Sequence, residues 1–447
     1  MAQNFLACDR DQSYLMPPSL RDWLAEDQLA WCVLDAVAEM DLSVIYGEYR
    51  ADGHGRAAFD PAMMTALLLY CYAIGERSSR AIERRCHLDV AVRVIAGNQQ
   101  PDHATIARFR ARHEDALAGL FGQVLALCAR AGLVALGVVA LDGTKVKANA
   151  SGLANRTYEQ IAEEMLRQAG EVDAEEDRVW GDARGDELPE PLADARSRRA
   201  RLRAAKEQLE AEQRAAVEAH EQRMQQRAER EAERGRKLGG RKPTPPGDQV
   251  DPEVRVNLTD SDSRSVMTPR GFVQGYNAQA VTTADQIIIA ADVLIGGTDK
   301  GQLEPMIRAA QSELSAAGVD APVDVALADA GYWKGEQIQN LWADGIRALV
   351  PPDGQADDKP GGEKGDGRRT GGIYDHMRRV LASEPGKGLY KQRGRTIEPI
   401  FGQTKHNRRV ERFQRRGIAA CRSEWRLIAA THNLLKLWRA SLALQSV

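Results

Sequence analysis

The spacing of apolar residues changes at Gly137, and this change limits the folds that the chain can adopt. From residue 18 to about residue 130, apolar residues return every three or four positions, which predicts a helical N-terminal domain over residues 1–130. From Gly137 on, VVALDGTKVKANAS carries β-branched apolar residues and then alternates, which predicts the first strands of an α/β domain over residues 131–155. A chain of 447 residues is long enough for two or three domains.

Residues 156–240 interrupt the α/β pattern and are dominated by Glu, Gln, Arg, Lys and Ala. This composition predicts an insertion of two long helices arranged as a hairpin. Leu202, Leu209, Val217 and Met224 have roughly heptad spacing, although the apolar seam slips by one residue. The insertion is therefore expected to be coiled-coil-like. The pattern leaves open whether it is a solvated arm or a contact surface for protein or DNA.

Residues 241–350 alternate between strand-like and helix-like segments and are predicted to continue the α/β domain. Strands are expected at GFVQGYNAQAVTT, QIIIAADVLI, DVALAD and RALVPP, and helices at EPMIRAAQSELSAAG and KGEQIQNLWADG. Residues 351–389 begin with a stretch rich in Gly, Asp and Lys and are predicted to form a flexible loop. Residues 390–447 are predicted to form the C-terminal catalytic and basic helices. The expected fold class is α/β, with an all-α N-terminal domain.

The charge and cysteine content exclude several classes of protein. The net charge is only −3, yet basic residues gather between Arg393 and Arg426, so a nucleic-acid contact would be regional. No stretch approaches the roughly 18 consecutive apolar residues of a membrane span, and the first residues lack the pattern of an export signal. We therefore expect a cytoplasmic, nucleoid-associated protein with no membrane partner. The six cysteines form no CxxC pair, which argues against a zinc ribbon or a disulfide framework.

Three carboxylates stand at informative places in the chain. Asp142 follows VVAL and Asp329 follows VALA, so each is expected where a buried strand ends. Ligands gather at the carboxyl ends of strands in open α/β sheets, and these two side chains could therefore share one rim. Glu398 is expected at the start of a helix, because Thr396 can cap a helix and Pro399 is tolerated in a first turn.

Taken singly, each of these acids is most often a turn or cap residue. Taken together they form a set of oxygen ligands, which Mg²⁺ and Mn²⁺ prefer. Two such ions, about 3.5–4 Å apart, can stabilise both the attacking and the leaving oxygen of a phosphoryl transfer. The three acids therefore predict a metal-dependent phosphodiester chemistry.

Four separated segments, DGTKVKANAS, RGFVQGYNAQAV, LADAGYW and YKQRGRTIEPIFGQTK, resemble those of the DDE transposases of bacterial insertion sequences. The resemblance extends over nearly the whole chain, including PDHATIARFR in the helical N-terminal domain. It implies a ribonuclease-H-like catalytic core. It also implies that Asp142, Asp329 and Glu398 are the catalytic residues and the ligands of Mg²⁺ or Mn²⁺, with two ions bound.

The family has a signature around its closing Glu: Tyr, two residues, Arg, three residues, Glu, six residues, Lys. Tyr390, Arg393, Glu398 and Lys405 match it in residue type. Arg393 departs by one position, because four residues separate it from Glu398. Either Arg393 or the nearby Arg395 could therefore take the role of the signature arginine.

Arginine suits a DNA phosphate because its planar fork makes two parallel charge-assisted hydrogen bonds. The alternative for each basic residue is an ordinary solvated surface cation. The residues expected to contact DNA are Tyr390, Arg393, Arg395, Lys405, Arg408, Arg409, Arg412, Arg108 and Arg110. Lys405, Arg409 and Arg412 are expected to continue the helical face of Glu398.

The N-terminal domain contains two candidate short helices, one starting at Ser78 and one starting after Asp102, with Arg108 and Arg110 on the second. A helix-turn-helix-like DNA reader and an ordinary helical bundle fit this pattern about equally. In the α/β part, Tyr276, Asn277, Tyr332 and Trp333 flank the motifs. They could contact flipped bases, although core packing is the more common role of such aromatics.

The expected function is transposition: binding of the element's terminal inverted repeats, metal-dependent strand cleavage, and transfer of the freed 3′-hydroxyl to target DNA. Because two ends must be brought together, the resemblance implies a homodimer in the synapsed state. Two alternatives remain open. One is a catalytically retired DNA-binding regulator, and the other is a ribonuclease-H-fold nuclease that lacks strand transfer.

Overall fold

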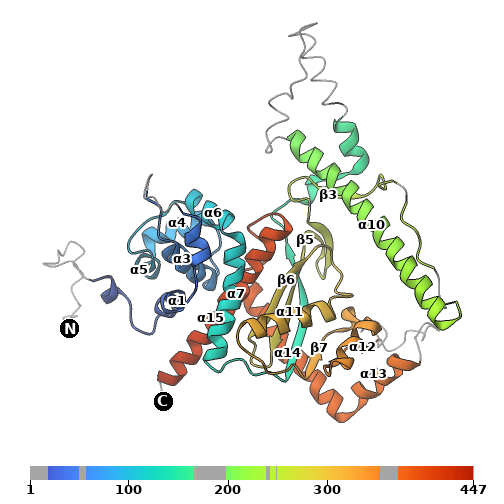
Figure 1. The fold of residues 1–447 in the computed structure, drawn as a ribbon. Coiled ribbons are helices and arrows are strands. Elements are labelled where there is room, and N and C mark those ends of the chain that lie inside the picture. The colour runs from blue at the N-terminus through green and yellow to red at the C-terminus, as the bar shows by residue number, and fades with distance from the viewer. Residues whose placement is uncertain are drawn as a thin grey trace, which may run out of the picture.

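The computed structural model describes residues 19–49, 57–165, 167, 198–237, 242–247, 249–352 and 371–445. A group of helices from the N-terminal part packs on one side of a mixed sheet (Figure 1). The long helix α10 (Arg198–Arg234) runs along the other side, at the right of the view. The sheet is flanked by helices, so the predicted α/β class is confirmed. Among the described residues, no helix is long and apolar enough to span a membrane.

The N-terminal helices pack around α3. Asp60 caps α3 by accepting a hydrogen bond from the backbone N–H of Ala62, and Pro61 occupies the first turn, where its missing N–H costs no helical bond. Nearly every later residue of α3 is buried, which makes this helix the centre of the N-terminal helices. The elements are η1 (Leu20–Trp23), α1 (Leu29–Ala38), α2 (Ser43–Gly47), α3 (Pro61–Ala73), α4 (Ser79–Leu88), α5 (Val90–Ile95), α6 (His103–Arg112) and α7 (Glu114–Arg130).

The central sheet has six strands in the order β4-β5-β1-β7-β8, with β6 paired to β5 further along that strand than β4. β1 runs antiparallel to β5, and β5 antiparallel to β4 and β6, whereas β7 and β8 run parallel to β1. The strands are β1 (Val138–Lys147), β4 (Arg264–Thr268), β5 (Gly271–Thr283), β6 (Ile288–Leu294), β7 (Val325–Leu327) and β8 (Arg347–Leu349). The sequence predicted all of these except β4.

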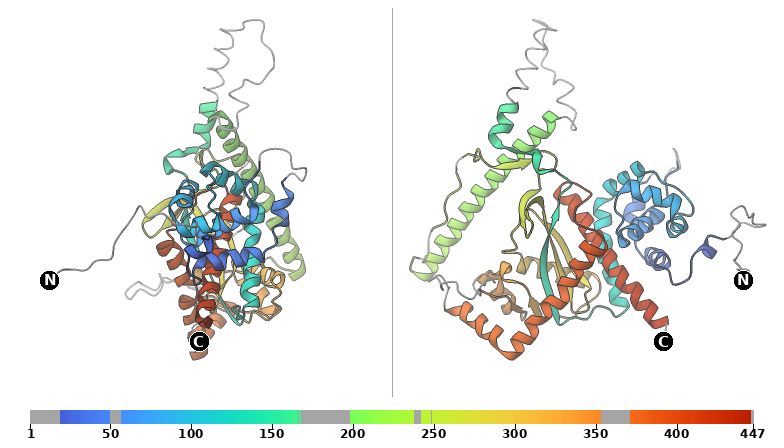
Figure 2. Two further views of the ribbon diagram at one scale, coloured as in Figure 1. Left: turned by 90° about the vertical axis from the view of Figure 1, so that its left-hand side faces the viewer. Right: turned by 180° about the vertical axis from the view of Figure 1, so that it is seen from behind.

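Helices cover both faces of the sheet. Figure 1 shows α11 in front of the strands, and the rear view in Figure 2 shows α14 crossing the opposite face. The last helix, α15, packs along both α7 and β6, and its Trp425 donates a hydrogen bond to the carbonyl of Gln279 at 2.8 Å. The helices are α11 (Leu303–Ala316), α12 (Gly335–Ala343), α13 (Gly372–Ala382), α14 (Glu384–Gly402), the π-helical turn η6 (Gln403–Asn407) and α15 (Ile418–Gln445).

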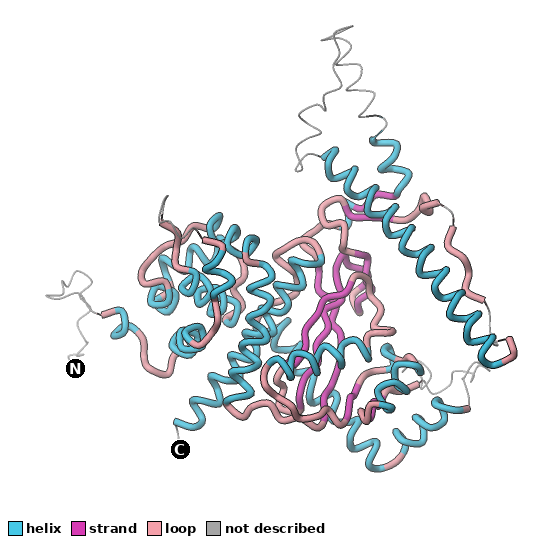
Figure 3. The backbone as a smooth tube through the Cα atoms, in the orientation of Figure 1, coloured by secondary structure: helices cyan, strands magenta, loops and turns pink. Residues whose placement is uncertain are grey.

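The inserted segment forms a long arm that leaves the sheet between β1 and β4 (Figure 3). A small antiparallel pair, β2 (Asn155–Thr157) with β3 (Arg255–Asn257), closes its base. Residues 158–165 are helical and pack against the first turns of α10 (Arg198–Arg234) through a separate cluster of buried apolar residues. The cluster contains Ile161, Leu202, Ala205, Leu209 and Val256. The expected turn between the two helices lies outside the described residues.

The heptad pattern of the arm is used only at its base. Leu202 and Leu209 are buried, whereas Val217 and Met224 remain partly exposed on the part of α10 that extends beyond the cluster. At the far end, Arg230 forms an exposed ion pair with Glu336 of α12 at 2.9 Å. The arm thus packs as a short two-helix contact and continues as a single charged helix.

The expected loop over residues 351–389 is partly wrong. Residues 353–370 lie outside the described residues, but residues 372–389 belong to α13 and to the first turns of α14. Ser383 caps α14, and Pro385 comes next to its start, where proline is tolerated. The glycines and basic residues of α14 hid this helix from an argument based on apolar periodicity.

A buried ionic cluster joins the N-terminal helices to the C-terminal segment. Arg77, between α3 and α4, contacts Glu424 of α15 at 2.7 Å, and the two side chains are 5% and 0% exposed. Arg77 also donates to the carbonyls of Arg412 and Arg409. Gly75 has a φ of +86°, and a Cβ there would lie 2.9 Å from the carbonyl oxygen of Arg408. The two parts therefore approach each other closely at this junction.

Candidate active site

The pairing of β1 with β7 brings two acids side by side. Ala140 of β1 lies opposite Leu327 of β7, and the same register carried two residues further places Asp142 opposite Asp329. β7 ends just before Asp329, which caps the next turn by accepting a hydrogen bond from the N–H of Gly331 at 2.9 Å. The structure thus places both acids on one rim, as the sequence predicted.

The predicted position of Asp142 within its strand needs correction. β1 does not end at Asp142 but continues to Lys147, because β5 pairs with it over its whole length. Asp142 comes to the rim because its parallel neighbour β7 is short and stops beside it. The length of the neighbouring strand, which the sequence of β1 does not contain, creates this opening.

Glu398 lies in the last turns of the nineteen-residue helix α14, not at a helix start. Thr396 is a buried interior residue of the helix, and Pro399 is inside it as well. The α-helix ends at Gly402, and a π-helical turn over Gln403–Asn407 follows and contains Lys405. The predicted stripe is therefore wrong for Arg409 and Arg412, because the helical turn ends at Asn407 and both residues lie beyond it.

Arg393 lies between the carboxylates of Asp142 and Glu398. Its Nη1 is 3.0 Å from Asp142 Oδ2, and its Nη2 is 3.6 Å from Glu398 Oε1. Glu398 reaches this contact by folding back over Gly394, where an added Cβ would lie only 3.3 Å from Glu398 Oε1. The extra residue between Arg393 and Glu398 is thus accommodated by a glycine one helical turn before the acid.

The electrostatics of the site reflect partly buried, neighbouring acids. Burial, and then the charge of Asp329, raise the pKa of Asp142 to about 6, although the N–H of Gly143 and the Arg393 guanidinium oppose the shift. Burial also raises the pKa of Asp329, with a contribution from Asp299 that Arg393 opposes. A cation close to these oxygens would stabilise their ionised forms.

The acids have the chemistry of a site for a divalent metal. Carboxylate oxygens are the ligands that Mg²⁺ and Mn²⁺ prefer, and a guanidinium cation already bridges Asp142 and Glu398. Within the described residues, however, no group of three or more His, Cys, Asp and Glu side chains is arranged to hold one ion. The carboxylates are suitable ligands for a divalent metal, and the Arg393 guanidinium separates Asp142 from Glu398.

A fourth acid beside Asp329, Asp299, was not predicted from the sequence. Its Oδ1 accepts hydrogen bonds of 2.7 Å from the side-chain amides of Asn277 and Gln279, both fully buried on β5. Its Oδ2 is 3.4 Å from Lys145 Nζ on β1. Asp299 precedes α11 in an irregular segment, and only the partners that β5 supplies distinguish it from an ordinary surface acid.

Gly143 provides the space for this fourth acid. A Cβ at position 143 would lie 2.6 Å from Asp299 Oδ1 and 2.7 Å from Asn277 Oδ1, and closer still to Gln279. We expect Gly143→Ala to lower the free energy of unfolding by about 1–3 kcal/mol, the usual cost of overpacking. Denaturant unfolding measures this. Gly152→Ala, with open space around it, is the control. An equal effect of both variants would contradict the crowding at Gly143.

The residues of the family-like signature lie near the acids. Tyr390 donates a hydrogen bond to the carbonyl of Ala328 at 3.3 Å, directly before Asp329. Lys405 donates to the carbonyl of Lys145 at 2.8 Å and is half-buried. Arg395 is exposed on α14, next to the site. Tyr390 therefore joins α14 to the end of β7, and Lys405 joins η6 to β1.

The remaining basic residues divide into exposed and buried sets. Arg108 on α6 and Arg409 and Arg412 after η6 are exposed. Arg408, in contrast, is 5% exposed and donates to the carbonyls of Tyr72 and Ile428 at 2.9 and 3.1 Å. Its contact with DNA was predicted from its place in a basic run. This prediction is corrected, because its donors are used inside the protein.

The predicted DNA contact of Arg110 is also wrong. It is buried at the end of α6 and donates to the carbonyl of Arg77 at 2.8 Å and to the hydroxyl of Tyr72 at 3.1 Å. Asp102 does cap α6, as predicted, through the backbone N–H of Thr105. Residues two positions apart on a helix point to nearly opposite sides. Arg108 is therefore exposed, whereas Arg110 is buried and has a structural role.

The aromatic residues near the motifs are mostly part of the core. Tyr276 is fully buried and donates to Asp260 at 2.6 Å, and Tyr332 is fully buried and hydrogen-bonds Gln279. Trp333 packs against Tyr374, with ring centroids 4.9 Å apart. Core packing, one of the two roles considered for Tyr276 and Tyr332, therefore explains their positions, and the buried Asn277 serves Asp299 instead of a base.

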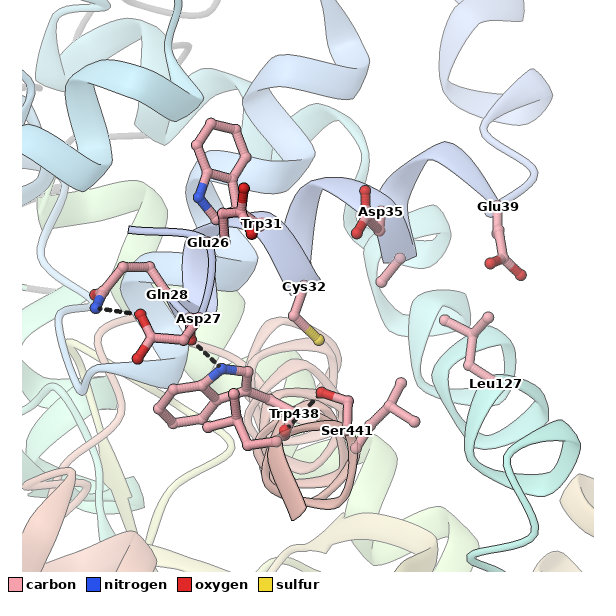
Figure 4. Close-up of a pocket in the computed structure, with 13 residues that line it drawn as sticks. Glu26, Asp27, Gln28, Trp31, Cys32, Asp35, Glu39, Leu127, Trp438 and Ser441 are labelled. Atoms are coloured by element: carbon pink, nitrogen blue, oxygen red, sulfur yellow. Dashed lines mark hydrogen bonds between the residues drawn. The ribbon is translucent and has the colours of Figure 1, made fainter. Parts of the chain in front are cut away.

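A cavity of about 240 Å³ lies away from these acids, between α1 and the end of α15 (Figure 4). Trp31, Cys32 and Trp438 line it together with several acids of α1 and the preceding segment. Trp438 donates a hydrogen bond to the carbonyl of Asp27 at 2.9 Å and fixes the end of α15 to the N-terminal helices. This cavity belongs to the junction between the helices and contains none of the predicted site residues.

Comparisons with known proteins match two segments of the chain. Residues 19–112 match the family described as Transposase domain (DUF772), and residues 369–438 match the family described as Transposase DDE domain. The first segment covers most of the N-terminal helices, and the second contains Arg393, Glu398 and Lys405. Asp142 and Asp329 lie between the two matched segments. The searches of curated proteins and of solved structures returned no match.

Proposed function

From the premise that this chain is a DDE transposase of an insertion sequence, we propose that it cuts DNA at the ends of its element and joins them to target DNA. One observation carries the proposal: the parallel register that places Asp142 beside Asp329 at the end of β7, with Arg393 linking Glu398 to Asp142. These are the three acids that the family resemblance assigns to catalysis.

The proposal includes a ribonuclease-H-like core. Its support is the order of the sheet: three long strands, β1, β5 and β6, pair antiparallel in chain order, and two short strands then join parallel to β1. The parallel strands are reached through α11 and α12, as parallel pairs require a crossover. The arm interrupts this core after its first strand, β1.

Asp142, Asp329 and Glu398 would hold Mg²⁺ or Mn²⁺, with two ions in the site. Bound there, the metal would activate the attacking water or 3′-hydroxyl and stabilise the charge that develops on the phosphate. The chain's own part is to fix the oxygens: β1 and β7 fix two of them, and α14 brings the third. Because each transfer replaces one phosphodiester by another, no high-energy cofactor is required.

DNA is the proposed partner at both ends of the molecule. The exposed cations Arg395, Arg409 and Arg412 lie on or directly after the helix that carries Glu398, and Arg108 is exposed on α6 of the N-terminal domain. Phosphate contacts of this kind hold a duplex in register without reading its sequence. A homodimer would bring two element ends together for transfer to target DNA.

Two other functions would use the same fold. A catalytically retired regulator would bind the ends without cutting them, and a nuclease would cut without joining. All three acids are present and Asp142 and Asp329 are adjacent, which favours the catalytic function over the regulator. The nuclease differs only in lacking the joining step after cleavage, so a plasmid assay that detects both steps separates the two enzymes.

The test uses the purified chain and a supercoiled plasmid that carries the DNA flanking its gene. With Mg²⁺ or Mn²⁺ we expect nicking at the element ends and joined products, and with a chelator neither. A plasmid with scrambled ends is the control and should stay intact. Cutting without joined products would identify a nuclease. End binding without cutting in either metal would overturn the proposal in favour of the regulator.

A further inference from the structure

The contact between Arg393 and the acids is the least expected feature of the site. The family signature predicts that this arginine contacts DNA, yet its guanidinium lies on Asp142 and Glu398. The side chain of Arg393 is only 16% exposed, whereas that of Glu398 is 63% exposed. A cation therefore already neutralises two of the oxygens on which the proposed chemistry depends.

We propose that Arg393 is an internal counter-ion that competes with the divalent metal for Asp142 and Glu398 and passes to a DNA phosphate when the metal binds. This inference rests on the proposed function, because it takes these acids as metal ligands. Arg393 acts here as a positioning residue: it affects the reaction through the oxygens that it contacts.

Competition follows from the shared oxygens. Asp142 Oδ2 accepts a charge-assisted hydrogen bond of 3.0 Å from Arg393, and a bound cation would need the same lone pairs. A divalent ion at this oxygen would also repel the guanidinium beside it. Because Arg393 lies between Asp142 and Glu398, these two acids can share one ion only after the guanidinium has left.

Of the two contacts that Arg393 makes, the one with Glu398 is longer and more exposed. The Arg393–Glu398 distance of 3.6 Å is longer than a good hydrogen bond, and the Glu398 side chain lies over Gly394 with most of its surface in solvent. Arg408 in the same chain has a different environment. It donates to two carbonyls and the hydroxyl of Thr431, all of them neutral groups, and is almost fully buried.

Release would give Arg393 a new partner of the same chemistry. A phosphate diester carries the negative charge and the paired oxygens that a guanidinium binds well. DNA held at the acids would present such a group beside α14. Metal binding and DNA binding should therefore favour each other, and the coupling must be reciprocal because both are equilibria.

The first experiment measures Mn²⁺ binding to the full chain without DNA by titration calorimetry at pH 8. We expect Arg393→Gln to bind Mn²⁺ at least about fivefold more tightly than the wild type, as expected when a partly exposed ion pair is removed. Arg393→Lys keeps a cation and should bind nearly as weakly as the wild type. Lys391→Gln, which changes another exposed cation of α14, is the matched control and should bind like the wild type.

The second experiment measures binding of a fluorescent duplex carrying the element end, with and without Mn²⁺. We expect Mn²⁺ to tighten wild-type binding and to have a smaller effect on Arg393→Gln. A merely structural arginine would leave this coupling unchanged and would instead lower the thermal unfolding temperature, which is recorded in parallel.

The outcomes separate this inference from the proposed function. If Asp142→Asn binds Mn²⁺ as tightly as the wild type does, the acids are not metal ligands and both proposals are overturned. If Mn²⁺ binding depends on Asp142 but Arg393→Gln binds no more tightly than the wild type, only the counter-ion is overturned. Arg393 would then only hold the side chains of Asp142 and Glu398 close together.

Discussion

Replacing Asp142 with Asn is expected to reduce metal-dependent cutting of the element ends by roughly 10³-fold or more. Asn keeps the size of the side chain but offers a single neutral carbonyl oxygen in place of the charged carboxylate. It would therefore hold a divalent ion poorly, and a lost stabiliser of transition-state charge costs a rate of this order. The measurement is the initial rate of plasmid nicking in Mg²⁺ and in Mn²⁺.

The same substitution should leave the fold intact. Burial raises the pKa of Asp142 to about 6, which means that folding disfavours its charged form at neutral pH. The neutral amide avoids that cost, so we expect the free energy of unfolding at pH 8 to be equal or higher. Asp285→Asn, an exposed acid between β5 and β6, is the control and should cut normally. A nicking rate within tenfold of wild type would remove Asp142 from the catalytic residues.

Replacing Arg77 with Met should lower the free energy of unfolding by about 3–5 kcal/mol. Glu424 would remain buried on α15 without the cation that it now contacts at 2.7 Å, and an unpaired buried charge is costly. The backbone N–H groups of Gln414 and Arg415 would still donate to it, but they carry no full charge. Denaturant unfolding of the full chain provides the measurement.

Two variants control this prediction. Glu336→Gln removes the exposed ion pair between α12 and the far end of α10, and it should cost less than about 1 kcal/mol. A double variant, Arg77→Met with Glu424→Met, removes both buried charges and should be more stable than Arg77→Met alone. If Arg77→Met costs no more than Glu336→Gln, the cluster does not hold the two parts of the protein together.

Local sequence patterns were enough to locate most of the strands and the first two acids. The β-branched runs before Asp142 and Asp329 predicted buried strands, and a sheet does place the two side by side. This worked because the parallel register of β1 with β7 brings Asp142, which lies inside β1, beside the end of the short strand β7. The third acid was found from the family signature, and its local structure was mistaken for a helix start.

The basic residues were the least predictable part of the site. In sequence, Arg408 and Arg409 are neighbours of equal charge, yet one is buried at the junction of the two parts and the other is exposed. The same holds for Arg108 and Arg110 on α6. Whether a guanidinium meets carbonyls or solvent depends on the helix that packs against it, and no local pattern records that helix.

The fourth acid and the role of Arg393 also depend on distant segments. Asp299 is fixed by two amides of β5, and Arg393 meets an acid of β1 that is 251 residues away in the chain. Periodicity describes how a segment folds on itself, so it could not predict either contact.

By itself the sequence determined most strands of the sheet and the order of its acids, because strand and helix periodicity are local properties of the chain. Only the tertiary structure decided which charges face one another. Packing removes water from some side chains and leaves others exposed. The neighbouring groups then decide whether a buried cation meets backbone carbonyls, as at Arg408, or carboxylates, as at Arg393.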